Sequence, residues 1–232
     1  AYLDQGEFFN DFADYDVHVE VPPGYTVAAT GVLNSKTTEG GMVDWHFQAE
    51  NVIDFAWFTS PAFRHEKYTG VVAGQNKVDL NVYYDPRDSV LWSKAGVYAA
   101  RALEFYSDWL GAYPYQQMSV VSAPLSAGGG MEYPMVAQIG YMEDSASLDL
   151  VIAHEIGHTW LYGILANNER AHPWMDEGLN SFIEAQYTAK YQPAYREAYL
   201  PREYTTRASM DQVDALQHAL HFSNTLQPPA TS

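Results

Sequence analysis

Apolar and polar residues alternate along much of the first third of the chain, which is the period of a β-strand with one buried face. The alternation is clearest over residues 15–21, 43–48 and 77–84. A Pro-Pro-Gly sequence follows the first of these segments and is typical of a turn. Several such strands with glycine-rich breaks between them predict an all-β unit, a sheet or a sandwich, over residues 1–85.

The period changes after Asp85. From there to Leu110, apolar residues recur every three or four positions, which predicts a helix with one apolar stripe in the core. Gly111 follows the last of them and is suited to end the helix. We therefore expect a domain boundary near residue 86 and a second domain over residues 86–232.

Both strands and helices are expected in this second domain. Strands are predicted over residues 117–122 and 131–139, and helices over 148–163 and 174–191. Asp149 would lie in the first turn of the earlier helix, where an acidic residue suits the helix dipole. Residues 193–227 have a helical pattern without any sign of a site. The whole chain is thus predicted to be an α+β protein.

The chain has an excess of acidic residues, which limits the kinds of molecule it is expected to bind. The 232 residues include 12 Lys and Arg against 29 Asp and Glu, a formal net charge of −17. This balance argues against nucleic acid, because phosphates need a basic surface. An acidic surface aids solubility, and it is also compatible with attraction of peptide amino termini. The longest apolar run is short and contains His154 and Glu155, so no membrane span is expected.

The chain contains no cysteine, which excludes disulfides and thiolate metal ligands. Any zinc must therefore be bound by histidines and carboxylates. Three histidines, His18, His46 and His65, lie among the predicted strands. None has metal-ligand spacing to a partner in the sequence, so we interpret them as surface residues.

The strongest candidate for chemistry is a His-Glu-x-x-His pattern inside an apolar, helix-like run. His154 and His158 are four residues apart, so on a helix their imidazoles lie on one face and can bind one metal ion. Neutral imidazole is a good zinc ligand. Glu155 lies about 100° further round the helix, where its carboxylate can face a water molecule at that metal.

Glu177 is the expected third zinc ligand. Eighteen residues lie between His158 and Glu177, which is enough for one helix to end, a loop to turn back and a second helix to begin beside the first. Pro173 suits the first turn of that second helix. Two histidines and one carboxylate with an open fourth position are the ligands of a catalytic zinc, and we expect one Zn²⁺ per chain.

Two points about this motif stay open. The alternative to a zinc site is a buried polar cluster without metal, which would require four suitably spaced residues to coincide. Asp176 could hydrogen-bond one of the ligand histidines, or it could cap the start of the second helix, and the sequence favours neither.

Three glycines at positions 128–130 precede Met131 and Glu132. They permit close approach of another backbone, such as an extended peptide. A phosphate-binding loop is the weaker alternative, because no Lys-Ser or Lys-Thr pair follows. Glu132 by itself would be interpreted as a carboxylate on a strand surface. Beside a zinc motif we favour a role in substrate binding.

Together these motifs resemble the gluzincin metallopeptidases, and within them the aminopeptidase N family. The Trp-Met-Asp-Glu-Gly-Leu sequence at 174–179 is similar to that family's sequence around its glutamate ligand. Residues 128–133, Gly-Gly-Gly-Met-Glu-Tyr, resemble the family's Gly-x-Met-Glu-Asn strand, which lines the substrate cleft. Tyr133 departs from the pattern, since the family usually has Asn there. Residues 6–12 look like the family's amino-terminal β domain.

The resemblance implies an α+β architecture in which part of an all-β amino-terminal domain, residues 1–85, precedes a thermolysin-like zinc peptidase domain, residues 86–232, that is truncated at its C-terminal side. It implies that Glu155 is the general base beside a zinc ion. The implied zinc ligands are His154, His158 and Glu177, and the implied substrate-binding residues are Gly129, Gly130, Met131 and Glu132. Glu132 would bind the free α-amine of a peptide, so the expected function is that of an aminopeptidase.

Two functional parts of the family are not found. The family's oxyanion-stabilising tyrosine lies well beyond the glutamate ligand, and the nearby tyrosines of this chain are too close to Glu177 to match it. These are Tyr187, Tyr191, Tyr195, Tyr199 and Tyr204. His218 and His221 are alternatives for that role, although a surface position is the simpler interpretation. The second amine-binding residue is expected upstream of Ala1. We therefore expect a fragment that binds zinc and turns over poorly.

Two other functions stay open. One is a thermolysin-like endopeptidase, in which Glu132 would contact only the substrate backbone. The other is a catalytically silent peptide-binding fragment. The sequence does not indicate an oligomeric state. A periplasmic or secreted location is favoured over a cytoplasmic one, because an acidic peptidase without cysteine fits those compartments.

Overall fold

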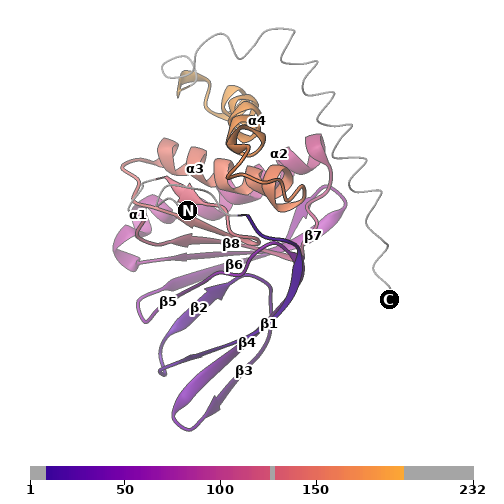
Figure 1. Cartoon of the computed structure of the whole chain (residues 1–232). Coiled ribbons are helices and arrows are strands. Elements are labelled where there is room, and N and C mark those ends of the chain that lie inside the picture. The colour runs from indigo at the N-terminus through magenta and orange to yellow at the C-terminus, as the bar shows by residue number, and fades with distance from the viewer. Residues whose placement is uncertain (1–8, 126–128, 196–232) are drawn as a thin grey trace.

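The computed structural model describes residues 9–125 and 129–195. These residues form three β-sheets and a layer of helices, which confirms the predicted α+β class. The main helices are α2 (Ala95–Leu110), α3 (Ser145–His158) and α4 (Glu177–Tyr191). Figure 1 shows that they cover one face of the largest sheet, while the amino-terminal strands extend away from the helices.

The amino-terminal sheet has three antiparallel strands in the order β1-β4-β3. Their bounds are β1 Ala13–Val21, β4 Met42–Val52 and β3 Val32–Glu39. One face of β1 and β4 is apolar and buried, with Val19 opposite Trp45 and Val21 opposite Val43. The alternating residues between them point to the other face, as the sequence pattern predicts. A two-stranded sheet of β2 (Thr26–Ala29) and β5 (Trp57–Ser60) completes this part of the chain.

The largest sheet has five strands in the order β6-β7-β8-β10-β9. Their bounds are β6 Arg64–Ala73, β7 Asn76–Tyr84, β8 Gln117–Ser122, β10 Val136–Ile139 and β9 Gly130–Met131. The pairs β7–β8 and β8–β10 are parallel, whereas β9 runs antiparallel to β10. A parallel pair needs a crossover connection, and the helical segment that ends with α2 provides it between β7 and β8.

The expected domain boundary near residue 86 does not coincide with a change of sheet. β6 and β7 precede that residue, yet they belong to the same sheet as β8 to β10. The change from one sheet to another lies between β5, which ends at Ser60, and β6, which begins at Arg64. Alternation shows that one face of a strand is buried but not against which layer, and the domain boundary near residue 86 stays a prediction.

The helix predicted between Asp85 and Leu110 is divided in the structure. A short 3₁₀ turn (η1, Pro86–Asp88) and a one-turn helix (α1, Ser89–Trp92) come before α2. α2 ends at Leu110, and Gly111 follows with φ of 115°, a conformation that glycine adopts without strain. The strand predicted over residues 131–139 is also divided, because the chain turns between β9 and β10 at Pro134 and Met135.

α3 begins earlier than predicted, at Ser145, where the Asp144 side chain accepts hydrogen bonds from the first-turn backbone. It continues beyond His158 into a π-helical turn (η2, Thr159–Gly163). Asp149 therefore does not lie in the first turn. It is fully buried and forms an ion pair with Arg101 of α2 at 2.5 Å, and it accepts a hydrogen bond from the Tyr187 hydroxyl of α4 at 2.7 Å. Asp149 thus joins three helices.

α4 begins at Glu177, three residues later than predicted, and Pro173 lies in a separate 3₁₀ turn before it (η3, Pro173–Met175). α3 and α4 approach closely at Gly157, where an added methyl group would collide with Oδ1 of Asn180. The Asn180 side-chain amide donates to the His154 carbonyl oxygen at 2.9 Å. This contact sets the position of α4 relative to the histidine-bearing face of α3. The helix predicted over residues 193–227 lies almost wholly outside the described residues.

Among the described residues, no helix has both the length and the apolar character that a membrane span requires.

Candidate metal centre

Two imidazoles on α3 point at a common position. Nε2 of His154 and Nε2 of His158 are 3.1 Å apart, and the two ring planes are inclined by 78°. This follows from the four-residue spacing of the two side chains on a regular helix. The helix itself is well fixed, because Ile152, Ala153 and Ile156 are fully buried in the main core. The histidine pair is therefore held on a rigid element.

Glu177 reaches the same position from the first residue of α4. Its Oε2 lies 3.3 Å from Nε2 of His154 and 3.7 Å from Nε2 of His158. A tetrahedral zinc ion with ligands at about 2.1 Å holds neighbouring donor atoms about 3.4 Å apart. The three donor atoms therefore have the separations that a zinc ion requires, and the structure brings together the predicted ligand set.

A carboxylate orients each of the two histidines. Nδ1 of His154 lies 3.0 Å from Glu184, and Nδ1 of His158 lies 2.5 Å from Asp176. Because an ionised carboxylate only accepts hydrogen bonds, we assign the imidazole proton to Nδ1 in both rings. Each Nε2 then carries a lone pair directed at the common position. Two lone pairs 3.1 Å apart repel each other unless a cation lies between them, so the donor set fits a metal.

These contacts bear on both roles considered for Asp176. Its side chain makes no capping hydrogen bond at the start of α4, and it is fully buried against His158. It occupies the position of a residue that orients a metal ligand. Glu184 was not singled out from the sequence. It lies two helical turns after Glu177, on the same face of α4, and that spacing could have indicated it.

The charges around the histidines favour a cation. Burial opposes a charge on His154, but hydrogen bonds with Glu177 and Glu184 raise its pKa well above the ordinary value. Burial likewise opposes a charge on His158, yet the charge of Glu132 and the hydrogen bond with Asp176 raise its pKa to about 9. The pKa of Glu177 is lowered, chiefly by its hydrogen bond with His154. A divalent ion would satisfy the same negative surroundings.

Glu155 lies on the side of α3 that faces strand β9. It is buried, and burial is the main cause that raises its pKa to about 8. A methyl group added at Gly130 would lie 2.5 Å from Cγ and 2.6 Å from Cδ of Glu155. Only glycine at position 130 leaves room for this carboxylate. The glycine of β9 and the acid of α3 thus share one space beside the histidines.

The predicted substrate-binding residues lie along the same edge. Gly130 and Met131 form β9, the outermost strand of the five-stranded sheet, and Gly129 precedes it with φ of 70°. Glu132 follows β9, and one of its carboxylate oxygens lies within 4.8 Å of ligand atoms of Glu155 and His158. The structure therefore brings β9 and Glu132 to the metal position. Gly128 lies outside the described residues.

Tyr133 occupies the position where the aminopeptidase N family usually has Asn. Its ring packs near that of Phe58 of β5, with centroids 6.1 Å apart, and it belongs to a small apolar cluster with Val121 and Val136. In this chain the residue after Glu132 therefore contributes to packing between the two halves of the structure.

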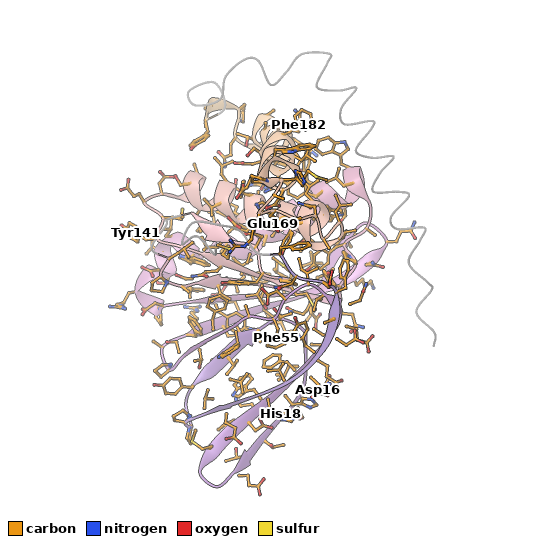
Figure 2. All side chains as sticks on the ribbon, in the orientation of Figure 1. Asp16, His18, Phe55, Tyr141, Glu169 and Phe182 are labelled. Atoms are coloured by element: carbon orange, nitrogen blue, oxygen red, sulfur yellow. The ribbon has the colours of Figure 1, made fainter. Side chains whose placement is uncertain are left out.

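Glu169 is a further acid near the site that sequence reasoning missed. It lies in the loop between η2 and η3 and is 1% exposed, and its carboxylate lies within 4.8 Å of oxygens of Glu132 and Asp176. Figure 2 labels Glu169 in the layer where the helices meet the larger sheet. A single acid in a loop has no periodic spacing to the zinc ligands, so the sequence offered no pattern that would identify it.

The tyrosines and histidines considered for oxyanion stabilisation are only partly described. The Tyr187 hydroxyl donates to Asp149 and accepts from Arg101, so it is committed to the contacts between helices. Tyr191 and Tyr195 pack at the edge of the core. The remaining candidates, Tyr199, Tyr204, His218 and His221, lie outside the described residues.

Two helix-borne histidines, a glutamate at the start of the next helix and a buried glutamate between the histidines together define a zinc-peptidase type of metal centre. The chain belongs to peptidase family M1: the profile of the Peptidase family M1 domain matches residues 97–230. This match covers the zinc motif, the third ligand, strand β9 and Glu132.

Curated relatives agree with this assignment. The chain is 23% identical over 183 residues to aminopeptidase M1-C of Oryza sativa subsp. japonica, which covers 74% of this chain and 21% of that protein. It is 31% identical over 87 residues to leukotriene A-4 hydrolase of Xenopus laevis, which covers 36% of this chain and 14% of that protein. The chain thus matches about a fifth or less of the length of these relatives.

Solved structures share the fold. A crystal structure of an M1 zinc metallopeptidase from Deinococcus radiodurans has a TM-score of 0.69 and 18% identity, and the match covers 97% of this chain and 59% of that one. A variant of that metallopeptidase bound to a Tyr-Ser-Ala substrate has a TM-score of 0.63 and 20% identity, and the match covers 78% of this chain and 42% of that one. The arrangement of sheets and helices is therefore that of an M1 peptidase.

Proposed function

We propose that this chain carries the catalytic centre of a zinc-dependent aminopeptidase, which removes residues from the free N-terminus of peptides. One observation carries the proposal: the donor atoms of His154, His158 and Glu177 converge to within 3.7 Å, with the Glu155 carboxylate beside them. Membership of family M1 supports the same activity.

When bound, a zinc ion polarises the scissile carbonyl and lowers the pKa of water to about 7. The side chains of this chain supply the rest. Glu155 takes a proton from the attacking water and then donates it to the leaving amine. Its position against Gly130 supports this role, because the carboxylate is buried beside the histidines and away from bulk water. Asp176 and Glu184 keep the imidazoles oriented.

The peptide substrate would bind along β9. In the described part of the chain this strand pairs only with β10 and forms the end of the sheet. An extended peptide can pair with such an edge through backbone hydrogen bonds. Gly129 and Gly130 carry no side chains that would obstruct the approach, and the strand leads directly to Glu155.

Glu132 is proposed to bind the free amino group of the substrate. Its position next to β9 and within 4.8 Å of ligand atoms of Glu155 and His158 supports this role. An ammonium group paired with Glu132 would place the first peptide bond of the substrate at the metal. That geometry would limit cleavage to the N-terminal residue, which is the difference between an aminopeptidase and an endopeptidase.

The test compares a short peptide that has a free amine with its N-acetylated twin, both assayed with zinc-loaded protein. We expect hydrolysis of the free-amine peptide alone, and Glu132→Gln should raise KM for it far more than it lowers kcat. Faster cleavage of the acetylated peptide would exclude an aminopeptidase and favour the endopeptidase alternative.

Protein that contains zinc but hydrolyses no peptide would favour the peptide-binding alternative. Glu155→Gln separates the two cases. In an enzyme this substitution should remove hydrolysis, whereas in a peptide-binding fragment it should leave the function unchanged.

A periplasmic or secreted location stays a prediction.

A further inference from the structure

The outer face of β1 and β4 brings two distant histidines together. In the antiparallel register, His18 lies directly opposite His46, with Asp16 opposite Gln48 and Glu20 opposite Asp44 on the same face. The other face carries the buried residues of the amino-terminal core. Sequence spacing gave no reason to pair these histidines, because the pairing depends on the strand register. Figure 2 labels His18 and Asp16 on the amino-terminal sheet, far from the helices.

The side chains form a compact group. The two imidazoles are stacked with centroids 4.2 Å apart and planes inclined by 5°. Oδ1 of Asp16 lies 2.8 Å from Nε2 of His46 and 3.8 Å from Nε2 of His18. Ligand atoms of all three residues lie within 4.8 Å of one another. A tetrahedral zinc ion needs donor separations of about 3.4 Å, and it lies close to the plane of each imidazole that binds it. One of the two stacked rings would therefore have to rotate to bind an ion shared with the other.

A second carboxylate orients one of the rings. Nδ1 of His18 lies 2.8 Å from Oδ2 of Asp44. The carboxylate accepts, so Nδ1 of His18 carries the proton and Nε2 presents its lone pair toward Asp16 and His46. Carboxylates fix ligand imidazoles in this way at established zinc sites. Asp44 thus accepts a hydrogen bond from Nδ1 of His18, as Asp176 does from Nδ1 of His158.

We propose that Asp16, His18 and His46 bind a second divalent metal ion of the zinc class, which joins β1 to β4. Imidazole and carboxylate donors suit Zn²⁺ and its transition-metal neighbours. The site would bind more weakly than the one on α3 and α4, because its side chains are freer. The side chains of Asp16 and His18 are 60% and 56% exposed, so binding must order them, and water would complete the coordination.

The alternative is a set of exposed hydrogen bonds without metal. In that case neutral His18 donates its Nδ1 proton to Asp44, and neutral His46 donates its Nε2 proton to Asp16. Metal binding therefore requires His46 to carry its proton on Nδ1 instead, so that Nε2 can bind the ion. The acidic neighbours favour a positive charge here, whether on a protonated imidazole or on a metal ion. A binding experiment therefore has to separate the two cases.

The experiment is a calorimetric titration of Zn²⁺ into intact protein that already contains its tightly bound zinc. We expect a second ion per chain, with an affinity that falls at least tenfold in His18→Ala and in His46→Ala. His65→Ala is the matched control, since His65 lies on β6, stacks on Tyr83 and bonds to Asn81 instead. The control should bind the second ion like the unmodified protein.

Two further measurements keep the proposal testable if a variant fails to fold. Imidazole NMR signals of His18 and His46 in the unmodified protein should shift during the titration, while those of His65 stay unchanged. Glu177→Ala should lose the tight ion and keep the weak one. The proposal is overturned if no second ion binds, or if its affinity is the same in both histidine variants and the control. It says nothing about peptide hydrolysis, so it stands or falls independently of the proposed function.

Discussion

Two groups of histidines and carboxylates in this molecule contain the same ligand types but differ in how they are held. On α3 and α4, the three donor atoms are 3.1–3.7 Å apart, and a carboxylate fixes each imidazole. On β1 and β4, the corresponding distances to Asp16 are 2.8 and 3.8 Å, and a carboxylate fixes only His18 through Nδ1. The first group lies against the main core and the second is largely exposed.

The difference shows what makes a metal centre suitable for catalysis. Ligand types alone are the same in both places, so they do not decide it. The α3–α4 group has rigid elements, oriented rings and a neighbouring acid, Glu155, that can move a proton. The β1–β4 group has no such acid beside a substrate-binding strand. We therefore expect the buried group to bind zinc tightly and to take part in hydrolysis. The exposed group should bind a metal weakly and affect only the stability of the fold.

The largest effect is expected from Glu155→Gln. Glutamine keeps the shape of the side chain but cannot take a proton, so hydrolysis should fall by about 100- to 10,000-fold. Zinc content should stay unchanged, because Glu155 is not one of the ligands. Steady-state kinetics and elemental mass spectrometry on the same sample measure both quantities. Parallel loss of zinc and activity would show that Glu155 holds the site together instead of acting on water.

Glu177→Ala should remove a direct ligand from the buried group. We expect zinc affinity there to fall by more than about 100-fold, the upper end of what an orienting carboxylate contributes. The exposed group should be unaffected, since it lies on another sheet. A competition titration with a coloured chelator gives the affinity. Unchanged affinity in this variant would refute the ligand assignment.

The orienting carboxylates offer a graded test. Asp176→Asn and Glu184→Gln should each weaken zinc binding at the buried group by about 10- to 100-fold. Asp176 should matter more, because it is fully buried against His158, whereas the Glu184 side chain is 26% exposed. The same chelator competition applies. Equal affinities in both variants and in the unmodified protein would show that ring orientation is set by packing alone.

A smaller effect is expected from the helix contact that positions the ligands. Gly157→Ala places a methyl group against Asn180 and should destabilise the fold by about 1–3 kcal/mol, because the close approach of α3 and α4 is lost. Gly163→Ala is the matched control in the following turn, where a methyl group would lie 3.8 Å from the nearest atom, the His158 carbonyl oxygen. Urea unfolding of both variants compares them, and equal losses would argue against the contact.

The sequence predicted the buried group well, because helical spacing turns directly into geometry. His154 and His158 needed only a regular helix, and Glu177 needed only a return helix beside it. Asp176 was weighed correctly as a possible partner of a ligand histidine. The α+β class followed from the change of period after Asp85.

What the sequence could not supply depends on pairing between distant segments. The membership of β6 and β7 in the larger sheet follows from their parallel pairing with β8, which alternation does not encode. The opposition of His18 and His46 needs the register of β1 on β4. Asp149 was placed at a helix start, but its burial with Arg101 appears only when α2 and α3 pack together.

The most direct test of the central claim is the zinc content of purified protein after gel filtration in metal-free buffer, measured by elemental mass spectrometry beside Glu177→Ala. The weak ion expected on β1 and β4 would be lost under these conditions, and the ion held by α3 and α4 would stay. The account predicts close to one zinc per chain in the unmodified protein and almost none in the variant. No zinc in the unmodified protein after prior soaking, or equal zinc in the two proteins, would contradict it.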